Sequence, residues 1–257
     1  MFSTLVSLSS FGAAEVGRHG QLWFAQLARA AGADSVEVRG ELLRDADAEL
    51  AQLRGLASVY SSPDGLWRSD GSLDTEALAR GLSRAAALNA PRLKMAIGGF
   101  DARRSAASFH ELRARLAAAA GERPIELLIE NDQTASAGTW AAIQRFVAAQ
   151  ADAGLDLGLT FDMGNWHWLG ECPLQAAQAL APHVRYIHCK GVQRRPDKWV
   201  AVPLTDSVAP WRAVLHALPA DVPHAIDYPL IGDDLHAVTC AELALLRELH
   251  AERNCST

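Results

Sequence analysis

The chain has 257 residues and a formal net charge of −6, with 49% hydrophobic and 21% charged residues. This balance is typical of a globular protein, and the length is close to the roughly 250 residues of a β/α barrel. The longest basic clusters, Arg103-Arg104 and Arg194-Arg195, are too short to follow a phosphate backbone, so we expect no nucleic-acid partner. No linker-like tract divides the chain, and we expect one domain over residues 1–257.

The cysteines and the N-terminal residues indicate the compartment. The four cysteines form no CxxC pair and no spacing typical of a disulfide framework or a structural zinc site. The first residues, MFSTLVSLSSFG, lack the basic segment of a signal peptide, and no apolar stretch approaches the length of a membrane span. We therefore expect a cytoplasmic protein with no membrane partner.

Short β-like runs alternate with Ala-rich runs whose apolar residues have helical spacing. The expected strands are 5–9, 35–39, 56–60, 92–97, 125–130, 156–162, 184–190 and 224–228. The clearest helical runs between them are 21–31, 75–88, 105–120, 139–151 and 235–250. Strict alternation predicts parallel strands, and eight such units in this length favour an α/β fold, a single closed (β/α)8 TIM barrel. An open doubly wound sheet is the alternative, but the first expected strand lacks the glycine-rich turn of a dinucleotide-binding sheet.

Strand side chains alternate between the barrel interior and the surrounding helices. Leu159 and Phe161 are large and apolar and should face the helices, which leaves Asp162 inside. The same alternation directs further polar residues inward: Glu37, Arg39, Lys94, Glu126, Glu130, His188, Lys190 and Asp227. Buried charges without partners are unfavourable, so these groups must pair with one another or bind something.

Four of the inward residues lie at or near the C-terminal ends of consecutive strands: Glu130, Asp162, His188 and Asp227. That end of a β/α barrel carries the active site. Carboxylates with one imidazole and no sulfur suit one divalent metal ion, whether Mn, Mg, Co, Zn or Fe. Each residue alone has an ordinary alternative, a hydrogen-bonded core histidine or a carboxylate paired with Arg or Lys. Their common height in the barrel favours a shared metal site.

Other polar and aromatic residues near this end are candidates for substrate binding. Arg39 is placed to recognise a hydroxyl or a carboxylate group, and Glu37 either contributes to this region or pairs with Lys94 beneath it. Three residues after the sixth expected strand are also candidates: Asn165, Trp166 and His167. Aromatic faces commonly line sugar sites, and the alternative for a loop tryptophan is a packing or dimer contact.

Five segments carry a resemblance to a known family: SVEVRGELL (35–43), IELLIEND (125–132), LTFDMGNWHWLGECP (159–173), VRYIHCKGV (184–192) and HAIDYPLIGDDL (224–235). In this order they resemble the xylose-isomerase-like TIM barrel superfamily, in its sugar phosphate isomerase/epimerase group. The resemblance implies one divalent metal ion held by Glu130, Asp162, His188 and Asp227. Asp227 departs from the family's usual Glu. Asn165 stands where many relatives carry a substrate-contacting His, with His167 two residues further on.

The resemblance also implies an activity, that of a metal-dependent sugar or sugar phosphate isomerase or epimerase. Such an enzyme transfers a proton next to a carbonyl group through an enediolate. Glu130 would be the first base and Asp227 the opposing acid/base, while Lys190 would stabilise the developing oxyanion or form a salt bridge with a neighbouring carboxylate. The implied partners are a small carbohydrate and further copies of the chain in a homodimer or homotetramer.

Three other functions are weighed against this one. A metal-dependent lyase or dehydratase acting on a polyol or related acid needs a similar site. A catalytically decayed barrel stays open because of Asp227. An endonuclease is disfavoured, because it would need a three-zinc cluster with many histidines and a basic groove, and the chain is acidic.

Overall fold

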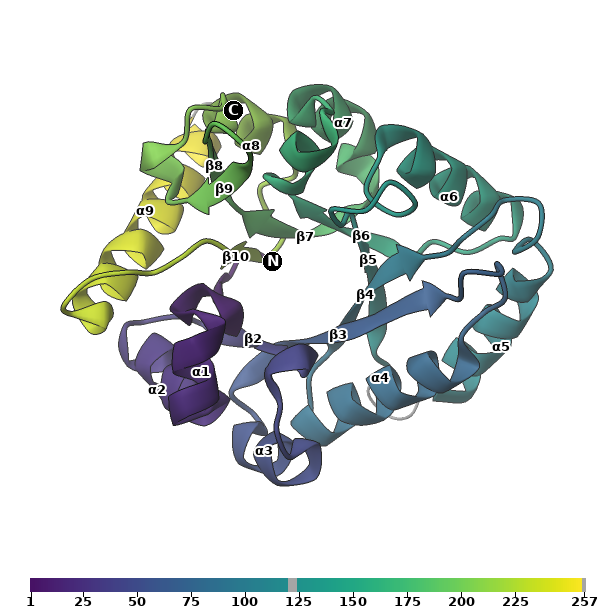
Figure 1. Ribbon diagram of the computed structural model, residues 1–257, viewed down its shortest axis with the longest axis horizontal. Coiled ribbons are helices and arrows are strands. Elements are labelled where there is room, and N and C mark those ends of the chain that lie inside the picture. Colours follow the sequence, from purple (N-terminus) through teal and green to yellow (C-terminus); the bar gives the residue numbers. More distant parts are fainter. Residues whose placement is uncertain (120–123, 256–257) are drawn as a thin grey trace.

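The protein is described here by a computed structural model that places residues 1–119 and 124–255. Eight parallel strands form a closed barrel in the order β1-β10-β7-β6-β5-β4-β3-β2. Figure 1 shows these strands at the centre, with the helices in a ring around them. The prediction of a single (β/α)8 barrel is confirmed, and the open-sheet alternative is excluded by the pairing of β1 with β10.

The elements follow one another in the predicted alternation. The barrel strands are β1 (Thr4–Ser7), β2 (Ser35–Arg39), β3 (Ala57–Trp67), β4 (Arg92–Gly98), β5 (Glu126–Glu130), β6 (Gly158–Asp162), β7 (Val184–Cys189) and β10 (His224–Ile226). The helices of the described residues are α1 (Ala13–His19), α2 (Gln21–Ala30), α3 (Ala46–Leu53), α4 (Thr75–Leu88), α5 (Ser108–Ala119), α6 (Trp140–Asp152), α7 (Pro173–Leu180), α8 (Trp211–Ala217) and α9 (Leu235–Cys255). None of these helices is long and apolar enough to cross a membrane.

Several boundaries differ from the expected ones. The third strand continues past its expected end at Tyr60 as far as Trp67, and the last barrel strand ends at Ile226. Helix α5 begins at Ser108 and not at Ser105, whose hydroxyl donates to the Gly71 carbonyl at 2.8 Å. The expected end of that helix, residue 120, lies outside the described residues.

An antiparallel ribbon, which the strand–helix alternation did not predict, follows the seventh barrel strand. It consists of β8 (Gly191–Arg194) and β9 (Trp199–Val202), paired from Gly191–Val202 to Arg194–Trp199. Figure 1 shows it beside α8, outside the barrel. The ribbon brings Ala201 to the mouth of the barrel, where it lines the cavity described below.

The alternation of side chains divides the core into two layers, as the sequence predicts. A small cluster fills the barrel interior: Leu5, Val59, Leu128, Tyr186 and Ala225. A much larger apolar layer lies between strands and helices and includes Leu159 and Phe161. The interior is thus only partly apolar, and its remaining space toward the C-terminal ends of the strands is filled by charged side chains.

Candidate metal centre at the barrel mouth

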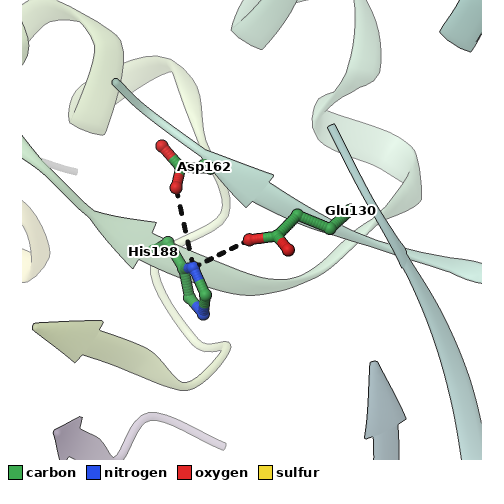
Figure 2. A group of neighbouring side chains, drawn as sticks. All are labelled: Glu130, Asp162 and His188. Carbon is green, nitrogen blue, oxygen red and sulfur yellow. Dashed lines mark ion pairs between the residues drawn. The ribbon is translucent and has the colours of Figure 1, made fainter. Parts of the chain in front are cut away.

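Three neighbouring strands bring Glu130, Asp162 and His188 together. Glu130 ends β5 and Asp162 ends β6, where it is directly opposite His188 of β7. Nδ1 of His188 lies 3.0 Å from Oε1 of Glu130 and 3.7 Å from Oδ2 of Asp162 (Figure 2). One ligand atom from each residue lies within 4.8 Å of the other two. The predicted convergence of these three side chains is therefore present in the structure.

The imidazole of His188 is held in a fixed orientation. Its Nε2 lies 2.7 Å from Oε2 of Glu37, a completely buried carboxylate that also accepts a hydrogen bond from the Tyr186 hydroxyl at 2.9 Å. Nδ1 is buried and has no hydrogen-bond partner among the described residues, although Oε1 of Glu130 lies 3.0 Å away. Metal-binding histidines have this arrangement, with one nitrogen held by a carboxylate and the other free for the ion. The residues present therefore fit a metal ion.

Asp162 is oriented by its own loop and by Asn131. Its Oδ1 accepts the backbone N–H groups of Gly164 at 2.8 Å and Asn165 at 2.9 Å. The Asn131 side chain bonds both the N–H and the carbonyl oxygen of Asp162, at 2.8 and 3.0 Å. These contacts leave Oδ2 as the oxygen that faces His188. Asn131 was not among the predicted site residues, although its position directly after Glu130 was a signal.

Asp227 approaches the same imidazole from the end of β10. Its Oδ2 lies 3.4 Å from Nδ1 of His188, but it is not part of the group of three within 4.8 Å. Its Oδ1 accepts a hydrogen bond from the Ser9 hydroxyl at 3.3 Å and lies 3.8 Å from Nη1 of Arg39. Direct ligation by Asp227 stays a prediction. Ser9 was also missed, because a serine after the first strand carries no distinctive pattern.

Two lysines neutralise the carboxylates. Nζ of Lys94 lies 2.5 Å from Oε2 of Glu130 and 3.5 Å from Oε1 of Glu37, so the expected Lys94–Glu37 pair exists but is the longer contact. Nζ of Lys190 lies 2.6 Å from Oδ2 of Asp162 and 2.7 Å from Oδ2 of Asp227. The salt-bridge alternative for Lys190 is therefore what the structure contains.

These contacts shift the pKa values of the centre. Burial alone raises the pKa of Glu130, but Lys94 and His188 lower it well below its ordinary value. Burial alone also raises the pKa of Asp227, which Lys190 and His188 lower. The pKa of His188 moves the other way: burial lowers it, but the carboxylates of Glu37 and Asp227 raise it well above its ordinary value. Both carboxyl groups are therefore ionised at neutral pH.

The residues predicted to bind substrate occupy different places. Arg39 lies at the mouth, where it lines a cavity of about 230 Å³ together with Ser9, Ser10, Lys190, Ala201, Asp227, Tyr228 and Pro229. Glu37 is completely buried beneath the centre, since parity directs it inward at a level below Arg39, and its contacts make it a support for His188. Its predicted substrate contact is corrected accordingly.

The three candidates after β6 lie in the 3-10 turn Asn165–Leu169. Trp166 is completely buried with its ring 5.4 Å from that of Phe161, so the packing alternative is correct and the predicted substrate contact is not. The side chain of Asn165 donates to the Asn131 carbonyl at 2.9 Å, and Lys190 donates to its Oδ1 at 3.3 Å. His167 is half-buried beside Trp199, with 4.9 Å between the two ring centroids, and burial lowers the pKa of His167.

Comparison with known proteins adds to this geometry. The sequence matches the family described as xylose isomerase-like TIM barrel over residues 25–224. No curated protein matches it. Among solved structures, L-ribulose 3-epimerase has a TM-score of 0.68 at 17% identity, over 100% of this chain and 97% of that one. The probable 3-DHS dehydratase AsbF from Bacillus anthracis has a TM-score of 0.65 at 14% identity, over 95% and 98%. The IolI protein, crystallised with a zinc atom, has a TM-score of 0.62 at 12% identity, over 98% and 97%.

Proposed function

Because this chain belongs to the xylose isomerase-like TIM barrel family, we propose that it is a metal-dependent enzyme that isomerises or epimerises a small sugar or sugar phosphate. One observation carries the proposal: the unbonded Nδ1 of His188 faces carboxylate oxygens of Glu130, Asp162 and Asp227. The likeness of the fold to L-ribulose 3-epimerase, and to IolI with its zinc atom, supports it.

The ion would be held by Oε1 of Glu130, Oδ2 of Asp162 and Nδ1 of His188, with Asp227 as the fourth residue. Mixed oxygen and nitrogen ligands of this kind suit Mn, Mg, Co, Zn or Fe. When bound, the ion supplies positive charge that stabilises the negative charge developing on substrate oxygens next to the reacting carbon.

The chain's own residues move the proton. Glu130 and Asp227 approach His188 from β5 and from the end of β10, which are separated in the barrel by β6 and β7. Two carboxylates on different sides of a substrate are what isomerisation or epimerisation needs, one to take the proton from carbon and the other to return it. We assign the first step to Glu130 and the return to Asp227. Lys190, 2.7 Å from Asp227, is placed to donate to a substrate oxygen that becomes negative.

Metal analysis and solvent exchange test the proposal together. Protein loaded with Mn²⁺ should hold about one ion per chain, and in D₂O it should place deuterium next to the carbonyl of a ketose without loss of water. Glu130→Gln should abolish exchange, and His188→Ala should abolish metal binding. Glu126→Gln is the matched control, because Glu126 lies at the other end of β5 and pairs with Arg92 at 3.1 Å. Metal content that survives His188→Ala would refute the site, and net dehydration would identify a lyase.

A further inference from the structure

The two lysines of the centre hold different kinds of carboxylate oxygen. Lys94 binds Oε2 of Glu130, whereas Oε1 is the oxygen 3.0 Å from Nδ1 of His188. Lys190 instead binds Oδ2 of Asp162 at 2.6 Å and Oδ2 of Asp227 at 2.7 Å. Those same two oxygens lie 3.7 and 3.4 Å from Nδ1 of His188. Lys94 therefore leaves the inward-facing oxygen of its carboxylate free, and Lys190 does not.

From this contrast we infer that Lys190 competes with the metal ion for Asp162 and Asp227, and that metal binding frees its ammonium group for an anionic group of the substrate. The inference rests on the proposed function. An ammonium and a divalent ion cannot share these oxygens without strong repulsion in a site so shielded from water. Asp162 has no other oxygen to offer, because its Oδ1 accepts the N–H groups of Gly164 and Asn165.

The cavity at the mouth lies where a freed ammonium would act. Lys190 and Arg39 both line it, and their side chains are 10% and 20% exposed. Its volume of about 230 Å³ leaves room for a carboxylate group and the carbon atoms next to it. A carboxylate is the group that a guanidinium and an ammonium bind most readily in a small space.

The ion pairs of the centre favour the same kind of ligand. The carboxylates of Glu37, Glu130, Asp162 and Asp227 are paired with Arg39, Lys94 and Lys190, and Arg39 has a further partner, Glu41, at 2.7 Å. A divalent ion at Asp162 and Asp227 would replace Lys190 as their counter-charge. The displaced ammonium group would then need another anionic partner, because a poorly hydrated charge without one is unfavourable. A negatively charged group of the substrate would supply that partner.

The first experiment measures metal affinity. Lys190→Met should bind Mn²⁺ about tenfold or more tightly than the wild type in a competition titration with a chelating dye, because a competing cation is gone. The melting temperature of its metal-free form should fall, because two carboxylates lose their counterion, and added Mn²⁺ should restore it. Lys190→Gln should change both quantities in the same direction, which guards against a folding defect of one variant. Lys198→Met, an exposed lysine on the loop of the ribbon, should change neither.

The second experiment tests the anion. At saturating Mn²⁺, wild-type protein should bind glycolate more tightly than ethylene glycol, and Lys190→Met should lose about tenfold of that preference. If the wild type binds no divalent ion, the proposed function itself falls. If it binds the ion but Lys190→Met binds it no more tightly, the competition is refuted and the proposed function stands. An unchanged preference for glycolate in Lys190→Met refutes the role of the lysine in anion binding.

Discussion

At the scale of single residues, the orientation of His188 decides what the centre is able to bind. A histidine inside a barrel strand is compatible with a core role, and only the contacts at its two nitrogens distinguish the roles. The Glu37 carboxylate holds Nε2 from beneath. Burial raises the pKa of Glu37, but His188 and Lys94 lower it to about 2. An ionised Glu37 keeps a proton on Nε2, so that Nδ1 is the nitrogen left to bind an ion.

Removal of the Glu37 carboxylate should weaken metal binding, although Glu37 is not one of the residues proposed to contact the ion. Glu37→Gln loses the charge that fixes the imidazole, and we expect the affinity for Mn²⁺ to fall by about 10- to 100-fold, as for other supports of metal-binding histidines. The measurement is the dissociation constant of Mn²⁺ from a dye competition. Tyr186→Phe is the control, because it removes only one donor to Glu37 and keeps the carboxylate on His188. Equal affinities of Glu37→Gln and the wild type would show that Glu37 does not orient the ligand.

At the scale of elements, the packing of helix α4 on strand β4 depends on a glycine. A methyl group at Gly81 would lie 2.9 Å from Cδ2 of Leu93, a completely buried residue. Gly17 of helix α1 has nothing within 4 Å of the same position. The two glycines therefore separate the effect of helix propensity from that of close packing.

Substitution by alanine should have opposite effects at these two sites. Gly17→Ala should raise the free energy of unfolding by about 0.5–1 kcal/mol, since alanine favours a helix in open space. Gly81→Ala gains the same propensity but must push Leu93 aside, which costs about 1–3 kcal/mol in a packed core. Urea denaturation should therefore place Gly81→Ala at least about 1 kcal/mol below Gly17→Ala. Equal stabilisation of both variants would mean that Leu93 moves freely.

At the scale of the whole molecule, closure of the barrel buries a histidine at the end opposite the metal centre. His224 begins β10, its backbone N–H donates to the Ser3 carbonyl at 2.9 Å, and its ring donates to the Val222 carbonyl at 2.8 Å. Burial lowers the pKa of His224 to about 4. The folded chain therefore holds this ring neutral at pH values where the unfolded chain protonates it.

This difference makes the stability of the barrel depend on pH. Above the unfolded pKa of about 6.5 the ring is neutral in both states. Between pH 6.5 and 4 the unfolded chain binds more protons, so the free energy of unfolding falls as the pH falls, by about 3 kcal/mol in total. Below pH 4 the contribution of this residue is constant.

Urea denaturation at a series of pH values checks this dependence. His224→Asn keeps a donor for the Val222 carbonyl but does not titrate, and it should flatten the curve between pH 6.5 and 4 relative to the wild type. His110→Asn, at an exposed position of α5, should leave the slope unchanged. A wild-type slope in His224→Asn would assign the dependence to other groups.

The sequence by itself determined the barrel, the boundaries of elements such as 75–88, and the inward direction of Glu130, Asp162 and His188. These follow from local periodicity, because alternation along a strand decides the face of each side chain wherever the partners lie. The resemblance to a family added the meaning of that set, and residues 25–224 match the family.

Only the tertiary structure decided which atoms meet. Glu37 and Arg39 share a face of one strand, but only Glu37 meets His188, while Arg39 lines the mouth, because the register between strands decides which side chains lie at the same height. Lys190 lies on Asp162 and Asp227 because three separate strand ends converge, which no spacing along the chain encodes. Trp166 was assigned to the site from its loop position, and its burial against Phe161 depends on packing between elements. Local pattern thus fixes the direction of a side chain, and the closed barrel fixes its partner.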